Sequence, residues 1–144
     1  MEKFWLESYP EGIPNDVDPN QYTSLGQLLE ESFHKNADRP FSVCLERWMS
    51  YRQLDELSSS LGAWLQGLGL APDARVAIML PNIPQFSVAM AAVLRAGYVC
   101  VNVNPLYTPR ELEHQLKDSG AKAILIVENF ATTLEEVIER TSET

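Results

Sequence analysis

Apolar residues change their spacing about halfway along the chain, and this change predicts two kinds of structure. Stretches that begin at Ser24 and Ser50 place leucines every three or four positions, which is typical of one face of a helix. Each serine is followed three positions later by a glutamine, the pattern of a capping box at a helix start. Between the two helices, Phe41–Cys44 and Trp48–Ser50 favour a short hairpin. This part is predicted to be a helix–hairpin–helix lead-in.

Three short and almost continuously apolar runs follow, from Val76 to Leu80, from Tyr98 to Val103 and from Ala123 to Val127. Such runs are typical of strands buried on both faces of a parallel sheet. Helical segments are predicted at 83–95 and 109–119, and a final helix near Asn129. The β-α-β-α-β-α order predicts an α/β fold: a partial doubly wound, Rossmann-like parallel sheet of three strands with flanking helices.

Two features suggest that this layer belongs to a larger domain. A three-stranded parallel sheet has two open edges, which intact domains avoid, and the helix from Ile83 to Leu94 is apolar on nearly every side. Prolines at positions 10, 14 and 19 predict an extended N-terminal lead-in over residues 1–23. Residues 24–144 are then expected to form the first part of a larger α/β domain, with Thr144 interpreted as a truncation point.

Charge and hydropathy exclude some classes of function. The chain carries 20 acidic and 11 basic residues, a formal net charge of -9, and this sign opposes nucleic-acid binding. The longest apolar run, Val88 to Leu94, is too short to cross a bilayer, and the N-terminus lacks a signal-peptide pattern. A cytoplasmic location is expected. Acidic pairs such as Glu30-Glu31 and Glu135-Glu136 are interpreted as solvated helix faces.

No residue is assigned a catalytic, cofactor-binding or metal-binding role from these patterns. Cys44 and Cys100 lie in strand-like runs and are expected to be buried, reduced thiols. His34 is expected near a helix end, where it favours the helix dipole. His114 is interpreted as an ordinary helical histidine, because no serine or cysteine motif points to it. Neither histidine is near a cysteine in sequence, so a zinc site is not supported.

Ligands of open α/β sheets bind beyond the carboxyl ends of the strands. No glycine-rich loop follows Leu80, so a self-contained nucleotide site is not supported. Asn82 is expected to cap the next helix, and Asn102 to be a buried amide that needs partners. Asn104 is expected to fix the turn at Pro105 by local hydrogen bonds. The segment from Thr108 to Glu111 has the pattern of a capping box with proline at the first helical position.

The segment from Val101 to Ala121 resembles the N-terminal region of the AMP-forming acyl-CoA synthetases, within the adenylate-forming superfamily. The bacterial long-chain fatty acid branch is the most similar. The resemblance extends over essentially the whole chain and includes Ser50–Leu54, Val76–Asn82, Leu94–Gly97, Trp5, Tyr9-Pro10 and Pro14. The chain departs from the family pattern at 72–75, where a Gly-Asp-Arg turn is usual, and at Ser87, where close relatives tend to have proline.

The resemblance implies a parent enzyme that joins a fatty acid to AMP using ATP and Mg²⁺, then transfers the acyl group to CoA. The family's phosphate loop, its adenine and magnesium motifs and its catalytic lysine lie downstream, so no catalytic residue is carried over. The chain alone is therefore expected to be inactive. Some long-chain relatives dimerise through the N-terminal region, which makes Phe4, Trp5 and Tyr9 candidates for packing between subunits or within the chain. Peripheral membrane contact of the parent is also implied.

Two alternatives stay open on the sequence. One is a standalone α/β binding or oligomerisation module. The other is a small nucleotide-binding domain, which the missing glycine loop disfavours.

Overall fold

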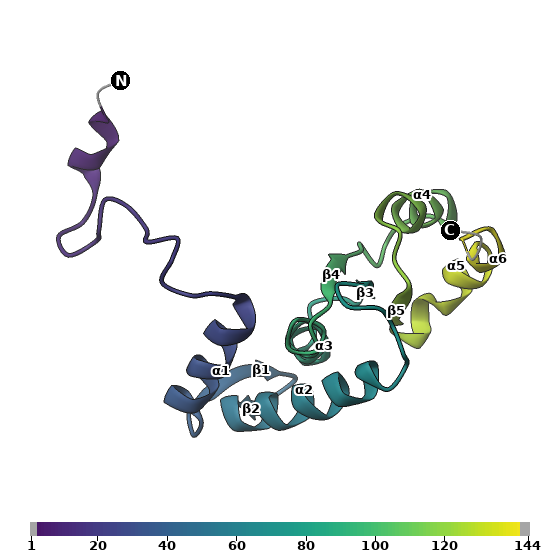
Figure 1. The fold of residues 1–144 in the computed structure, drawn as a ribbon, viewed down its shortest axis with the longest axis horizontal. Helices are drawn as coiled ribbons and strands as arrows, with labels where there is room; N and C mark the ends of the chain where they lie inside the picture. The colour runs from purple at the N-terminus through teal and green to yellow at the C-terminus, as the bar shows by residue number, and fades with distance from the viewer. Residues whose placement is uncertain (1–2, 142–144) are drawn as a thin grey trace.

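The computed structural model describes residues 3–141 and shows a small α/β body with a long N-terminal arm (Figure 1). The elements are η1 (Phe4–Ser8), α1 (Leu25–Asn36), β1 (Pro40–Cys44), β2 (Arg47–Ser50), α2 (Tyr51–Gln66), β3 (Arg75–Met79), α3 (Pro84–Arg95), β4 (Val99–Asn102), α4 (Pro109–Ser119), β5 (Ala123–Ile126), η2 (Glu128–Phe130), α5 (Ala131–Glu135) and α6 (Ile138–Thr141). None of the helices within residues 3–141 has both the length and the apolar character needed to cross a membrane.

The N-terminal arm extends away from the body and contains one short 3-10 helix, η1 (Figure 1). Residues 9–24 contain neither helix nor strand. Phe4 and Trp5 contact each other edge to face, with ring centroids 5.4 Å apart. Apolar side chains along the arm, including Phe4 and Val17, are exposed. The arm therefore presents apolar surface that the body of the same chain does not cover.

The helix–hairpin–helix order is confirmed, and the predicted serine caps position both helices. Ser24 Oγ accepts a hydrogen bond from the backbone N–H of Gln27 at 3.1 Å. Ser50 and Gln53 complete a reciprocal capping box at the start of α2. In the antiparallel hairpin between them, Leu45 has a positive φ of 47° and the next residue one of 63°. These angles are those of a two-residue type I′ turn, here built without glycine.

Strands β3, β4 and β5 form a parallel sheet in the order β4-β3-β5, so β3 is central (Figure 1). Four consecutive residues of β3, Val76 to Met79, are completely buried. Val76 and Ile78 pack with α2 and α3, whereas Ala77 and Met79 pack with Leu112 of α4 on the opposite face. Helices thus cover both faces, and the predicted doubly wound sheet is confirmed.

The apolar helix α3 is covered on several sides, as its sequence predicts. Val93 packs toward β3, and Ala91 contacts the separate cluster formed by α1, β2 and α2. A Cβ added at Gly62 of α2 would lie 3.2 Å from the carbonyl oxygen of Ala92. The absence of a side chain at Gly62 therefore lets α2 approach α3 closely.

Two details differ from the sequence-based expectations. The helix predicted from Asn129 is divided into η2, α5 and α6. An i→i+3 hydrogen bond from Val137 N–H to the Leu134 carbonyl tightens the chain at this break. The break places Val137, which is completely buried, in the cluster beneath α4. Asn82 is not the cap of α3, because the helix starts one residue later, with Ile83 as its N-cap and no side-chain capping bond.

Candidate functional site

The carboxyl edge of the sheet is the place where doubly wound folds bind ligands, and three loops meet this edge. Leu80 to Ile83 follow β3, residues 103–108 follow β4, and η2 follows β5. The loops after β3 and β4 lead to helices on opposite faces of the sheet. Polar residues near this edge include Asn82, Asn102, Asn104 and those at the start of α4.

Asn104 has the local role that its sequence predicts. Its Oδ1 accepts the backbone N–H of Leu106 at 3.0 Å, and its carbonyl oxygen accepts that of Tyr107 at 3.1 Å. Asn102 differs from its expectation because it is exposed at the end of the edge strand β4. Its Oδ1 accepts a weak hydrogen bond from the Cys100 thiol at 3.5 Å. An exposed amide can bond to water, so Asn102 does not need a buried partner.

The capping box at the start of α4 is confirmed. Glu111 accepts hydrogen bonds from the backbone N–H of Thr108 at 2.8 Å and from its hydroxyl at 2.7 Å. Thr108 Oγ1 in turn accepts the backbone N–H of Glu111 at 3.4 Å. These bonds, first the one from the Thr108 backbone, hold the pKa of the Glu111 carboxyl below its ordinary value. The Glu111 carboxylate is thus engaged in shaping the helix start.

We expect the contribution of Glu111 to stability to depend on pH. Because its pKa is lowered in the folded state, the stabilisation is present above the ordinary pKa of a glutamate and is lost as the pH falls through the folded value. At pH 7 the wild type should therefore melt at a higher temperature than Glu111→Gln. The gap should narrow as the pH falls through the lowered pKa of the Glu111 carboxyl, because the protonated carboxyl carries no charge, like the amide of the variant. Thermal unfolding measured from pH 3 to 7 tests this, with Glu135→Gln, at an exposed position, as the matched control. A gap that stays constant with pH would contradict it.

A wide hollow at the start of α4 is lined by Thr108, Arg110, Glu111 and His114. Both Arg110 and His114 are exposed. The lining contains no cysteine or serine that His114 could activate. His34 also lies exposed, in the last turn of α1. The interpretation of both histidines as ordinary helical residues stays a prediction.

The two cysteines are free and only partly buried. Burial raises the pKa of the Cys100 thiol, which favours its neutral form. Cys44 lies on β1 of the hairpin and Cys100 on β4 of the sheet. Across residues 3–141, no three or more His, Cys, Asp or Glu side chains are grouped so that they could hold a metal ion.

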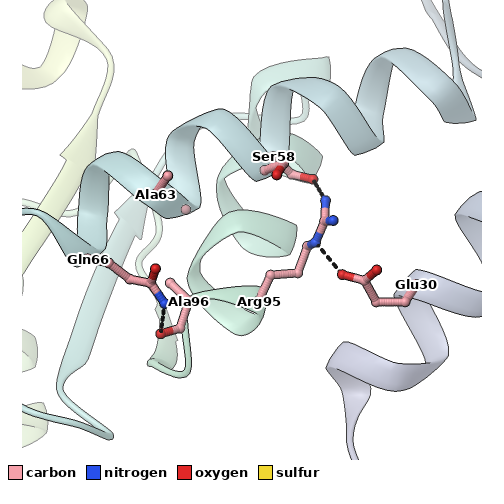
Figure 2. A pocket seen from close by; sticks show the side chains of 8 residues that line it. Glu30, Ser58, Ala63, Gln66, Arg95 and Ala96 are labelled. Carbon is pink, nitrogen blue, oxygen red and sulfur yellow. Dashed lines mark hydrogen bonds and ion pairs between the residues drawn. The ribbon is translucent and has the colours of Figure 1, made fainter.

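The most extensive side-chain network in the part of the chain that the structure describes is centred on Arg95, in the last turn of α3 (Figure 2). Its Nε lies 2.8 Å from Glu30 Oε1 of α1. Its Nη1 donates to Ser58 Oγ of α2 at 2.8 Å and lies 2.8 Å from Asp55 Oδ1. The guanidinium carbon also lies 5.3 Å from the centre of the Phe33 ring. We call Glu30, Asp55, Ser58 and Arg95 the Arg95 cluster.

The Arg95 cluster joins three helices instead of forming a reactive centre. Only 14% of the Arg95 side chain is exposed, and Ser58 is completely buried. A hollow of about 250 Å³ beside the cluster is also lined by Gln66 and Ala96, which are joined by a hydrogen bond from the Gln66 amide to the Ala96 carbonyl (Figure 2). The guanidinium bonds to side chains of α1 and α2 at once, so its charge holds the helices together. Glu30, interpreted from the sequence as part of a solvated helix face, is partly exposed and also pairs with Arg95.

The role of Arg95 in joining the helices was not predicted from the sequence. Its only signal is a charged residue at the end of an otherwise apolar helix, where it can also bond to the helix's last turn. The acidic partners lie 65 and 40 positions earlier in the chain, so no local pattern connects them.

The chain is similar in sequence to known enzymes. The family model described as AMP-binding enzyme matches residues 29–144. The long-chain-fatty-acid–CoA ligase of Salmonella typhimurium is 53% identical over 143 residues, which cover 99% of this chain and 26% of the Salmonella protein. The ligase of the same name from Bacillus subtilis is 35% identical over 127 residues, covering 88% of this chain and 22% of that protein. The chain thus spans about a quarter of the length of these relatives.

The fold also matches part of a longer chain among the solved structures. The anthranilate CoA ligase AuaEII, in complex with anthranoyl-AMP, matches with a TM-score of 0.78 and 22% sequence identity. The match covers 83% of this chain and 23% of the ligase chain. At this identity the similarity shows a shared fold.

Proposed function

Because the chain belongs to the AMP-binding enzyme family, we propose that it is the N-terminal structural portion of an ATP-dependent long-chain fatty acid–CoA ligase. The whole enzyme would convert fatty acid, ATP and CoA into acyl-CoA, AMP and pyrophosphate. The observation that carries this proposal is the 53% identity to the Salmonella ligase over 99% of the chain. The same identity favours part of a ligase over a standalone binding module.

Residues 3–141 do not fit the cofactors that such an enzyme would use. The loop from Leu80 to Pro84 contains no glycine, so its backbone cannot approach a phosphate chain as a glycine-rich loop does. The acidic side chains of these residues form no group suited to Mg²⁺. We therefore assign no chemical step to this chain. Its role in the proposed enzyme is to support the domain that encloses the nucleotide and acyl sites, which the remainder of the parent chain would complete.

The proposal is tested by ATP–pyrophosphate exchange in the presence of long-chain fatty acids. We expect background exchange from the 144-residue chain and clear exchange from the full-length product of the same gene. Circular dichroism of the 144-residue chain serves as the control, since an unfolded chain would be inactive for a trivial reason. Fatty-acid-dependent exchange by the folded 144-residue chain would contradict the structural role. No such exchange by the full-length product would contradict the ligase assignment.

We further propose that the parent is a cytoplasmic protein that forms a homodimer through the N-terminal arm and contacts membranes peripherally. Support for the dimer is the exposure of Phe4, Trp5 and Tyr9, with 74%, 42% and 42% of each residue exposed. Apolar side chains so placed gain from burial against a partner. Sedimentation velocity of the full-length protein, with and without residues 1–22, tests the dimer, and liposome flotation tests membrane contact. A monomer in both forms would contradict the dimer.

A further inference from the structure

The hairpin of β1 and β2 has a strained turn that presents an apolar side chain to solvent. Leu45 and Glu46 occupy the two central positions, with φ values of 47° and 63°. Positive values of this kind favour glycine or asparagine, because other side chains are crowded by the backbone there. Leu45 is nevertheless 91% exposed, so the fold gains no burial from it. A strained residue that the fold does not use is a candidate for an external contact.

The outer face of the hairpin extends this apolar surface. Val43 and Trp48 pair across the two strands, so their side chains share a face. They are 51% and 66% exposed, whereas Met49, the next residue in the chain, is buried on the opposite face. Val43, Leu45 and Trp48 therefore form a protruding apolar surface, which we call the hairpin tip.

The charge around the hairpin tip is opposite in sign to that of the whole chain. Residues 34–52, which include the hairpin, contain four basic and two acidic residues, within a chain of net charge -9. One basic and one acidic residue of this segment pair with each other, and the other acidic residue, Glu46, lies in the turn. Lys35, Arg39 and Arg47 are exposed, and none of them forms an ion pair within residues 3–141. An anionic surface therefore attracts this end of the chain and repels the rest.

The size and composition of the hairpin tip favour a lipid surface over a protein partner. A stable protein interface buries about 800 Å² on each partner, and three side chains at the end of a hairpin supply far less. A bilayer surface needs no partner of complementary shape. Tryptophan is favoured at the boundary between lipid headgroups and acyl chains, and leucine gains from burial among the acyl chains. Basic side chains beside them attract anionic headgroups.

We propose that the hairpin tip docks the parent protein on a bilayer surface that carries anionic headgroups. Leu45 and Trp48 enter the boundary between headgroups and acyl chains, and Arg47 binds lipid phosphate beside them. This inference rests on the peripheral membrane contact in the proposed function, which it assigns to named residues and to a headgroup charge.

Liposome flotation of the full-length protein tests the docking surface. The vesicles contain either phosphatidylcholine alone or phosphatidylcholine mixed with phosphatidylglycerol, which is anionic. We expect the protein to bind the mixed vesicles and to bind them less at high salt, because salt screens the attraction of basic side chains to headgroups. Trp48→Ala should weaken this binding about tenfold. Trp64→Ala is the matched control, since Trp64 is 57% exposed near the other end of α2 and should bind like the wild type.

Leu45→Asn separates docking from stability. Asparagine tolerates a positive φ better than leucine does, and it removes the apolar side chain. This variant should therefore melt no lower than the wild type, yet bind the mixed vesicles about tenfold more weakly. Thermal unfolding without vesicles measures the first effect and flotation the second. A clear fall in the melting temperature would overturn the proposal, because it would show that the remainder of the parent chain covers Leu45.

The other outcomes distinguish the parts of the proposal. Unchanged vesicle binding by both hairpin variants would overturn the role of the hairpin tip and leave peripheral membrane contact in place. Equal binding of the wild type to neutral and mixed vesicles would overturn the preference for anionic headgroups. A wild type that binds neither kind of vesicle would overturn membrane contact altogether. The ligase assignment is tested separately, by ATP–pyrophosphate exchange.

Discussion

Replacing Arg95 with methionine is expected to lower the free energy of unfolding by about 2 kcal/mol. Methionine keeps the apolar stem but removes the guanidinium, which leaves the Glu30 and Asp55 carboxylates facing each other without a cation. It also leaves the hydroxyl of the completely buried Ser58 without this donor. The expected loss in the free energy of unfolding is smaller than for a fully buried ion pair, because 47% of the Glu30 side chain and 35% of the Asp55 side chain are exposed.

Urea denaturation at pH 7 measures this effect, and Arg52→Met is the matched control. Arg52 also pairs with a carboxylate, that of Asp38 at 2.6 Å, but both side chains are largely exposed. Water can replace such a contact, so the control should unfold like the wild type. Equal effects of the two arginine substitutions would show that Arg95 contributes no more than a surface ion pair.

Replacing Leu112 with alanine is expected to cost about 3 kcal/mol, the largest single effect that the structure predicts. Leu112 is completely buried on the face of the sheet opposite α3, where it packs with Ala77 and Met79 of β3. The substitution removes apolar contact and leaves a cavity between α4 and the sheet, which the central strand cannot fill by moving.

Leu106→Ala is the control for this substitution, because 79% of Leu106 is exposed in the loop before α4. Its free energy of unfolding in urea should equal that of the wild type within error. A loss below about 1 kcal/mol for Leu112→Ala would mean that α4 does not cover this face of the sheet.

Much of the fold follows from local sequence signals. The caps at Ser24, Ser50 and Thr108 are each completed by residues three positions away, so a short window contains the whole interaction. The three apolar runs correctly predict parallel strands, but only β3 is buried on both faces, whereas the edge strands β4 and β5 are partly exposed. The break at Val137 was not predicted, since a tertiary contact beneath α4 decides it.

The polar contacts between elements were less predictable, because tertiary packing and not a local pattern decides them. The Arg95 cluster combines side chains from three helices, and only packing brings them together. Asn82 shows the limit clearly, because its sequence spacing fits a helix cap while the helix begins one residue later. No local pattern distinguishes these two outcomes, since asparagine is favourable both as a cap and in a loop.

The central position of β3 affects how the chain folds during its synthesis. The middle strand of the sheet is the earliest of the three in the sequence, and its two neighbours are translated after it. While the ribosome is still adding those neighbours, the apolar residues of β3 have no hydrogen-bonded partner on either edge. This nascent segment is therefore exposed to aggregation or chaperone capture until β5 has emerged.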